Sequence, residues 1–135
     1  MNIIIAGAGK VGFNLARTLS IGHNVTIIDK NKEALHRIQE SLDIMPMNGD
    51  VEDSKTYEKF IDKKIDLFIA VTNADNVNLI STLMAGSVLQ INRKIVRIKN
   101  HFYADSLVQE KLNISLMVYP IKLASQAIVS LLQYP

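Results

Sequence analysis

Residues 3–12 have the sequence IIIAGAGKVG, an apolar run that leads directly into glycines spaced as G-x-G-x-x-G. An apolar run without a polar interruption is typical of a strand buried on both faces of a sheet. After the glycines, Val11, Leu15 and Leu19 recur at helical spacing and predict an amphipathic helix over residues 11–20. This segment therefore predicts a strand, a tight turn and a helix in immediate succession.

The glycine loop consists of Gly7–Ala8–Gly9–Lys10–Val11–Gly12. Because Gly7 directly follows a strand, it allows a tight turn that a Cβ would obstruct. Gly9 lets a pyrophosphate approach the backbone, and Gly12 lets the helix pack closely on the sheet. The free N–H groups and the dipole at the start of the helix favour an anion here. We therefore predict that the whole loop, with Ala8, Lys10 and Val11, holds the pyrophosphate of a nucleotide.

Short apolar runs alternate with segments of helical spacing along the rest of the chain. This alternation predicts right-handed crossovers and a parallel sheet with helices on both faces. The expected fold class is α/β: a Rossmann-like, doubly wound parallel sheet of about six strands, in a single domain over residues 1–135. The further strands are expected over residues 25–28, 44–47, 67–71, 95–98 and 116–119, and the further helices over residues 32–42, 52–60, 76–89, 103–111 and 121–132.

Composition narrows the class of protein. The 135 residues suffice for one domain with a core, and we expect this domain to belong to a longer protein. A formal net charge of +2 with scattered basic residues gives no support for nucleic-acid binding. The absence of cysteine excludes disulfides and thiolate metal sites and fits a reducing compartment. We expect neither a secretory signal nor a membrane-spanning run of roughly 18 apolar residues.

Asp29 stands at the end of the second predicted strand, 22 positions after Gly7. In a doubly wound sheet the ligand lies beyond the carboxyl ends of the strands, beside the first strand. A carboxylate at this place can accept hydrogen bonds from both ribose hydroxyls of an adenosine and would repel a 2′-phosphate. NAD or an adenine nucleotide is therefore favoured over NADP. The alternative is that Asp29 caps the next helix.

The ends of the third and fourth strands carry further polar candidates. Asp50 could accept from the adenine amino group or cap the helix over residues 52–60, and spacing does not separate the two. Thr72 could contact a ribose or the second half of a dinucleotide. Asn73 or Asp75 could instead be the N-cap of the long helix that follows.

Arg97 lies within an otherwise apolar fifth strand. An unpaired guanidinium there would be costly, so we expect an anionic partner, either a phosphate or a carboxylate.

The sequence shows no set of residues that is typical of a catalytic site. His23, His36 and His101 are all expected at the surface, and we find no Ser–His–Asp set, paired carboxylates or metal cluster. The site is therefore expected to bind its ligand without reacting with it. The competing hypothesis is the cofactor domain of a small NAD-dependent oxidoreductase, which would need a general acid near Thr72.

The chain resembles the regulator-of-potassium-conductance (RCK) domain of the TrkA-N or KTN type, found in Trk and Ktr potassium uptake systems. The resemblance runs over nearly the whole chain. Its more particular motifs are Asn48–Gly49–Asp50 and the Thr-x-x-Asp-x-x-Asn pattern from Thr72 to Asn78. It also includes the glycine loop, residues 25–31, Ile95–Ile98 and Tyr119–Pro120.

The resemblance implies a regulatory domain that is not an enzyme. Such domains bind NAD(H), ATP or ADP, assemble into dimers or rings, and act on a membrane potassium transporter from its cytoplasmic face. By position, the loop glycines would line the pyrophosphate, Asp29 the ribose, Asp50 the adenine, Thr72 the central ligand and Arg97 the phosphates. Lys30, Val51 and Asn73 are expected to line the same site, whereas Asp75 and Asn78 would contact the ligand or shape the loop. The helix over residues 121–132 resembles the crossover helix through which neighbouring domains pair, and Asn31 stands where relatives often have an acid.

Overall fold

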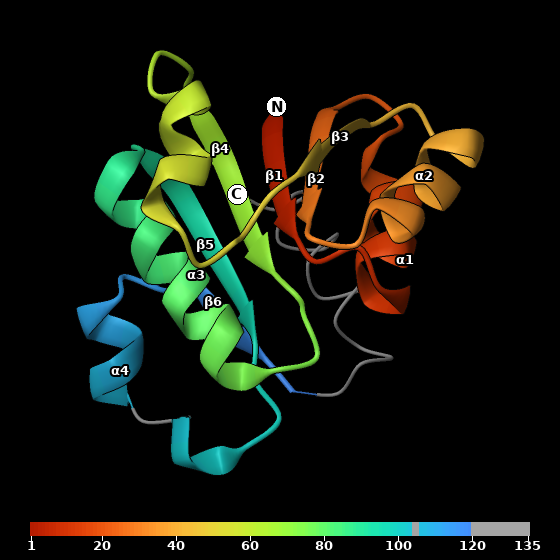
Figure 1. The fold of residues 1–135 in the computed structure, drawn as a ribbon. Coiled ribbons are helices and arrows are strands. Elements are labelled where there is room, and N and C mark those ends of the chain that lie inside the picture. The colour runs from red at the N-terminus through yellow and green to blue at the C-terminus, as the bar shows by residue number, and fades with distance from the viewer. Residues whose placement is uncertain (104–105, 120–135) are drawn as a thin grey trace.

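The computed structural model of the chain describes residues 1–103 and 106–119, and Figure 1 shows their arrangement. The strands are β1 (Asn2–Ala6), β2 (Asn24–Asp29), β3 (Met45–Asn48), β4 (Ile65–Ala70), β5 (Ile91–Arg97) and β6 (Leu116–Val118). The α-helices are α1 (Lys10–Leu19), α2 (Lys32–Ser41), α3 (Asp75–Val88) and α4 (Ser106–Lys111). Two 3-10 helices, η1 (Ser54–Phe60) and η2 (His101–Tyr103), complete the elements of the described residues.

The six strands form one parallel sheet in the order β3-β2-β1-β4-β5-β6. The chain thus proceeds outward from β1 to β3 and then returns to β4 on the other side of β1 (Figure 1). Ile5 in the central strand β1 pairs with Ile27 of β2 and Ile69 of β4, and all three side chains are fully buried. The predicted doubly wound α/β sheet is confirmed. The switch in strand order falls beside β1, where the glycine loop begins.

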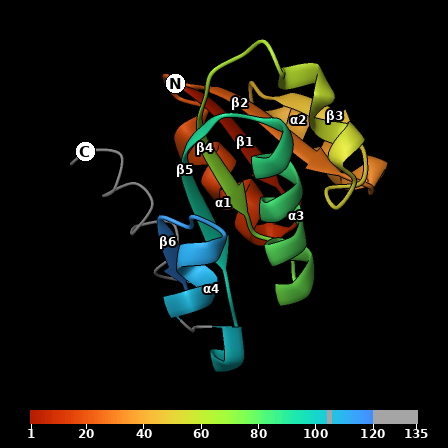
Figure 2. The same cartoon turned by 90° about the vertical axis from the view of Figure 1, so that its left-hand side faces the viewer.

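Helices cover both faces of the sheet. One apolar cluster joins α1 and α2 to the sheet through Leu15, Leu35 and Ile38. The cluster on the other face contains Tyr57 and Phe60 of η1 together with Ala85 of α3. Figure 2 shows α1 and α3 on opposite sides of the strands. Because both faces are covered, the central strands β1 and β4 are buried over most of their length and are mostly apolar, whereas the shorter β3 near the edge is at most half-buried.

Some helices differ from their predicted form. The helix expected over residues 52–60 is a 3-10 helix that begins at Ser54, because Asp53 is its N-cap and accepts from the Lys55 N–H at 2.9 Å. Of the helix expected over residues 103–111, the structure describes α4 from Ser106 to Lys111, while Tyr103 belongs to η2. The expected crossover helix over residues 121–132 lies outside the described residues. Within the described ranges, no helix has the length and apolar character needed to cross a membrane.

Candidate functional site

Two of the loop glycines are required by the fold itself. Gly7 has a φ of +122°, and a Cβ added there would lie 3.1 Å from the backbone N of Thr72. A Cβ on Gly12 would lie 2.0 Å from the carbonyl oxygen of Gly7, so the first turn of α1 can approach β1 only without a side chain. These positions hold the strand–helix junction together and explain the predicted spacing.

Gly9 is different, because a Cβ there would meet no protein atom within 4 Å. Its φ of −80° is open to any residue, and it is the N-cap of α1 without a side-chain capping bond. Packing therefore does not explain a glycine here. The open space lies at the N-terminus of a helix, where an anion is favoured.

A cavity of about 520 Å³ opens in front of this loop, at the carboxyl ends of the central strands. It brings together eleven of the predicted residues: Gly7, Gly9, Lys10, Val11, Asp29, Lys30, Asp50, Val51, Thr72, Asn73 and Arg97. Gly49, Glu52, Val71 and Val77 line it as well and were not predicted. Gly49 and Glu52 lie in the same loop as Asp50, so their position just after a predicted strand could have identified them as lining residues.

Three predicted residues do not line the cavity. The backbone N–H of Ala8 donates to a carboxylate oxygen of Asp29 at 2.7 Å, and Gly12 lies against Gly7. Asp75 accepts the backbone N–H groups of Lys99 and Asn100 at 2.8 and 2.7 Å. Asp75 therefore ties the start of α3 to the segment after β5, instead of facing the cavity.

Asp29 does not cap the next helix. The N-cap of α2 is Asn31, whose side chain accepts from the Ala34 N–H at 3.1 Å. The two carboxylate oxygens of Asp29 accept from the N–H groups of Ala8 and Asn31 at 2.7 and 2.8 Å. Since each carboxylate oxygen has two acceptor positions, both retain capacity for a hydroxyl donor in the cavity.

Asp50 is not a helix cap either, since Asp53 caps η1. One carboxylate oxygen of Asp50 accepts from the Glu52 N–H at 2.9 Å, and the other lies 3.4 Å from Nζ of Lys30. This exposed ion pair joins the ends of β2 and β3 across one side of the cavity. Its contribution to stability is small, of the order of 0–1 kcal/mol.

Thr72 and Asn78 form a compact hydrogen-bond network. The side-chain oxygen of Asn78 accepts from the N–H and the hydroxyl of Thr72 at 2.8 and 2.6 Å. Its amide nitrogen donates to the carbonyls of Thr72 and Arg97 at 3.1 and 2.9 Å. Asn78 is fully buried, so it shapes this loop, which was one of its two expected roles. Neither Asn73 nor Asp75 is the N-cap of α3; that residue is Ala74, which makes no side-chain capping bond.

Arg97 is 3% exposed and lines the cavity. One terminal nitrogen donates to the Thr72 carbonyl at 3.2 Å and to the Asn73 side-chain oxygen at 3.4 Å. Its Nε is buried without a hydrogen-bond partner, and no carboxylate of the described residues pairs with the guanidinium. The carboxylate alternative is therefore not realised in the described part of the chain. A buried cation with neutral partners at a cavity wall favours an anionic ligand.

Two of the candidate histidines lie elsewhere. Nδ1 of His23 is 3.2 Å from the terminal amine of Met1, and Nε2 of His36 is 3.0 Å from a carboxylate oxygen of Glu40. The lining of the cavity contains neither. Among the described residues, no group of three His, Cys, Asp or Glu side chains could hold a metal ion.

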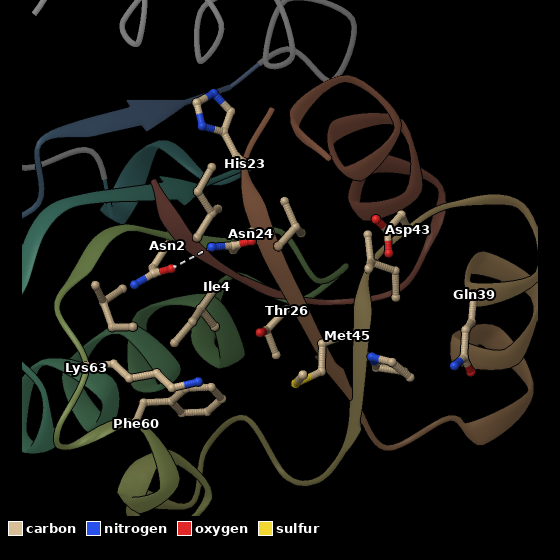
Figure 3. A pocket seen from close by; sticks show the side chains of 15 residues that line it. Asn2, Ile4, His23, Asn24, Thr26, Gln39, Asp43, Met45, Phe60 and Lys63 are labelled. Carbon is tan, nitrogen blue, oxygen red and sulfur yellow. Dashed lines mark hydrogen bonds between the residues drawn. The ribbon is translucent and has the colours of Figure 1, made fainter. Parts of the chain in front are cut away.

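A second hollow of about 460 Å³ lies near the amino ends of β1 and β2 (Figure 3). Asn2 and Asn24 contact each other there at 3.3 Å, and none of the predicted site residues lines it. The cavity at the glycine loop is therefore the better candidate site.

The chain is similar to known proteins over most of its length. The TrkA-N domain family model matches residues 3–120. A Trk system potassium uptake protein TrkA homolog of Archaeoglobus fulgidus is 42% identical over 105 residues, which are 78% of this chain and 24% of that protein. The chain thus spans about a quarter of the length of this relative.

Solved structures share the fold. The NAD(P)-binding domain of an exopolyphosphatase-related protein from Archaeoglobus fulgidus has a TM-score of 0.78 at 21% identity, over 98% of each chain. The GsuK channel bound to NAD has a TM-score of 0.70 at 18% identity, over 87% of this chain and 21% of that chain. Short-chain oxidoreductases are also among the similar structures, so the fold alone does not separate binding from catalysis. The family model, which covers most of the sequence, shows that this chain belongs to the TrkA-N domain family.

Proposed function

We propose that this chain is the nucleotide-sensing domain of a potassium-uptake regulator and that it binds NAD(H), or alternatively ATP or ADP, without turnover. The observation that carries the proposal is the buried Arg97 guanidinium, which has neutral partners and an unpaired Nε beside the cavity of the glycine loop. A nucleotide phosphate would supply the missing anion.

The pose follows from the chemistry of the lining. The phosphates would lie over Gly9 at the start of α1, between Lys10 and Arg97. The ribose hydroxyls would donate to the free acceptor positions of Asp29, and the adenine amino group to Asp50. The same Asp29 would repel a 2′-phosphate and disfavour NADP.

The likeness to a potassium uptake protein and to a channel bound to NAD supports both the ligand and the regulated process. The partner would be a Trk- or Ktr-type membrane potassium transporter, approached from the cytoplasmic face by a homodimer or ring of such domains. Since the chain spans about a quarter of its relative, other parts of such a protein would take part in this contact.

A ligand can drive a conformational change only through different affinities for the two conformations. The contacts around the cavity offer a path for this coupling. Asn73 accepts from Arg97 through its side chain and from Nζ of Lys99 through its carbonyl, the latter at 2.8 Å. Nucleotide binding at Arg97 would therefore act on the segment that follows β5.

Calorimetric titration with NADH, NAD, ATP and ADP tests the proposal. We expect binding by the wild type, and at least about tenfold weaker binding after Asp29→Ala, because a charged acceptor is lost. Gly9→Asp is expected to abolish binding, since it places a carboxylate against the phosphates. The exposed variant His36→Ala is the control. A folded domain that binds none of the four nucleotides would contradict the site, and steady NADH consumption with a reducible substrate would favour the oxidoreductase.

A further inference from the structure

The residues Gly49–Glu52 follow β3 and form one wall of the cavity; we call them the acidic loop. Two backbone carbonyl groups of this loop, those of Asp50 and Val51, accept hydrogen bonds from hydroxyl groups of η1.

Thr56 and Tyr57 provide these hydroxyl groups. The Thr56 hydroxyl donates to the Asp50 carbonyl at 2.6 Å, and the Tyr57 hydroxyl donates to the Val51 carbonyl. Tyr57 is fully buried, and its ring packs edge-on against Phe68 with centroids 5.8 Å apart. The Val51 carbonyl is therefore directed into the core rather than into the cavity.

We propose that Thr56 and Tyr57 are positioning residues for recognition of the adenine amino group. By engaging the backbone carbonyls of the acidic loop, they leave the carboxylate of Asp50 as the acceptor that faces the base. This inference rests on the proposed function, because it concerns the same nucleotide site.

The electrostatic surroundings keep the Tyr57 hydroxyl protonated and hold the Asp50 carboxylate in place. Burial, together with the nearby carboxylates of Asp50 and Glu52, raises the pKa of Tyr57 well above its usual range. The phenol therefore remains a donor at neutral pH. The Asp50 carboxylate is fixed in turn by the Glu52 N–H and by Lys30.

The test compares ligands whose bases differ at the amino group and at the adjacent N1, which is an acceptor in adenine and carries a hydrogen in hypoxanthine. The probes are NAD and nicotinamide hypoxanthine dinucleotide, with ATP and ITP as a second pair. Hypoxanthine has a carbonyl where adenine has the amino group, so it presents an acceptor to the carboxylate. For the wild-type full chain we expect the adenine member of each pair to bind about tenfold more tightly.

Thr56→Val keeps the shape of the side chain and removes the hydroxyl, and Tyr57→Phe keeps the ring against Phe68. In each variant the ratio of the two dissociation constants should fall to about threefold or less, while affinity for the hypoxanthine ligand changes less than about twofold. Thr56→Ser restores a hydroxyl and should restore the ratio. Thr18→Val, at the far end of α1 from the cavity, is the matched control and should leave the ratio unchanged.

The outcomes separate this inference from the proposed function. Variants that bind both ligands with the wild-type ratio, or a wild type that does not distinguish the two, would overturn the positioning role and leave nucleotide binding intact. A wild type that binds neither ligand would overturn the proposed function and the inference with it. Should Tyr57→Phe fail to fold, Thr56→Val and its serine rescue decide the question.

Discussion

Arg97 connects stability and binding at the scale of a single residue. Its guanidinium is buried with an unpaired Nε, so in the ligand-free protein it is an incompletely compensated charge. An apolar side chain of similar length would remove the cost of burying this charge and, at the same time, the hydrogen bonds to Thr72 and Asn73, so the two effects offset each other. The same group is the strongest candidate for contact with a phosphate.

We therefore expect Arg97→Met to change the free energy of unfolding by no more than about 1 kcal/mol. Nucleotide affinity should fall at least about tenfold, because a charged hydrogen bond is lost. Urea denaturation and calorimetry on the same preparation measure the two quantities. A large loss of stability with unchanged affinity would assign Arg97 to the core instead of the site.

Asn78 has the opposite role, since its side chain makes four hydrogen bonds, all of them inside the protein. Asn78→Ala leaves the Thr72 N–H and the Arg97 carbonyl without these partners, and we expect a loss of about 2–4 kcal/mol. Asn76→Ala, an exposed residue on the same helix, is the control and should cost less than about 0.5 kcal/mol. Equal effects in a urea denaturation series would show that the network does not stabilise the loop.

At the scale of elements, the junction of β1 and α1 contains one glycine that packing requires, Gly12, and one that packing does not require, Gly9. Gly12→Ala places a Cβ 2.0 Å from the Gly7 carbonyl oxygen, so the helix must shift and we expect a loss of about 2 kcal/mol or more. Gly9→Ala meets no protein atom, and its stability should stay within about 0.5 kcal/mol of the wild type.

Binding should show a different pattern, because the added methyl group of Gly9→Ala enters the space assigned to the pyrophosphate. We expect a clear loss of nucleotide affinity in this stable variant. Thermal denaturation with and without NADH reports both effects. A Gly9→Ala protein with wild-type affinity would show that the phosphates do not approach the loop here.

At the same scale, the buried phenol of Tyr57 in the 3-10 helix η1 makes the free energy of unfolding depend on pH in the alkaline range. The pKa of Tyr57 is raised in the folded state, above the value of 10.0 that it has when exposed. As pH rises through about 10, the unfolded chain loses this proton while the folded chain keeps it, so stability is complete below this pH and declines above it. Urea midpoints between about pH 8 and 11 should therefore fall less in Tyr57→Phe than in the wild type. Parallel pH curves would contradict the burial of the phenol.

At the scale of the whole molecule, the sheet could be predicted because its central strands β1 and β4 are buried on both faces and are therefore mostly apolar in sequence. The meeting of candidate residues such as Asp29 and Thr72 at one cavity could be predicted from the same pattern, since the carboxyl ends of parallel strands lie at one edge of the sheet. The sequence could not decide which residue is the N-cap of each helix. Where several Asn and Asp residues follow a strand, backbone geometry decides which one caps, and at α3 the N-cap is Ala74.

The contacts between segments that are distant in the sequence could not be predicted either. The partners of Arg97 are the carbonyl of Thr72 and the side chain of Asn73, which lie on another strand end. Similarly, the contacts of Thr56 and Tyr57 with the acidic loop depend on the 3-10 geometry of η1. Periodicity predicts which face of an element is buried, whereas such contacts depend on the exact path of the loops.

The central claim is that the cavity at the carboxyl ends of the strands holds a nucleotide. A structure from crystals of the full chain that are grown with saturating NADH tests this claim most directly. We predict the pyrophosphate over Gly9, the ribose at Asp29 and a phosphate oxygen within hydrogen-bond distance of Arg97. An empty cavity under these conditions, or a nucleotide bound at another place on the molecule, would contradict the account.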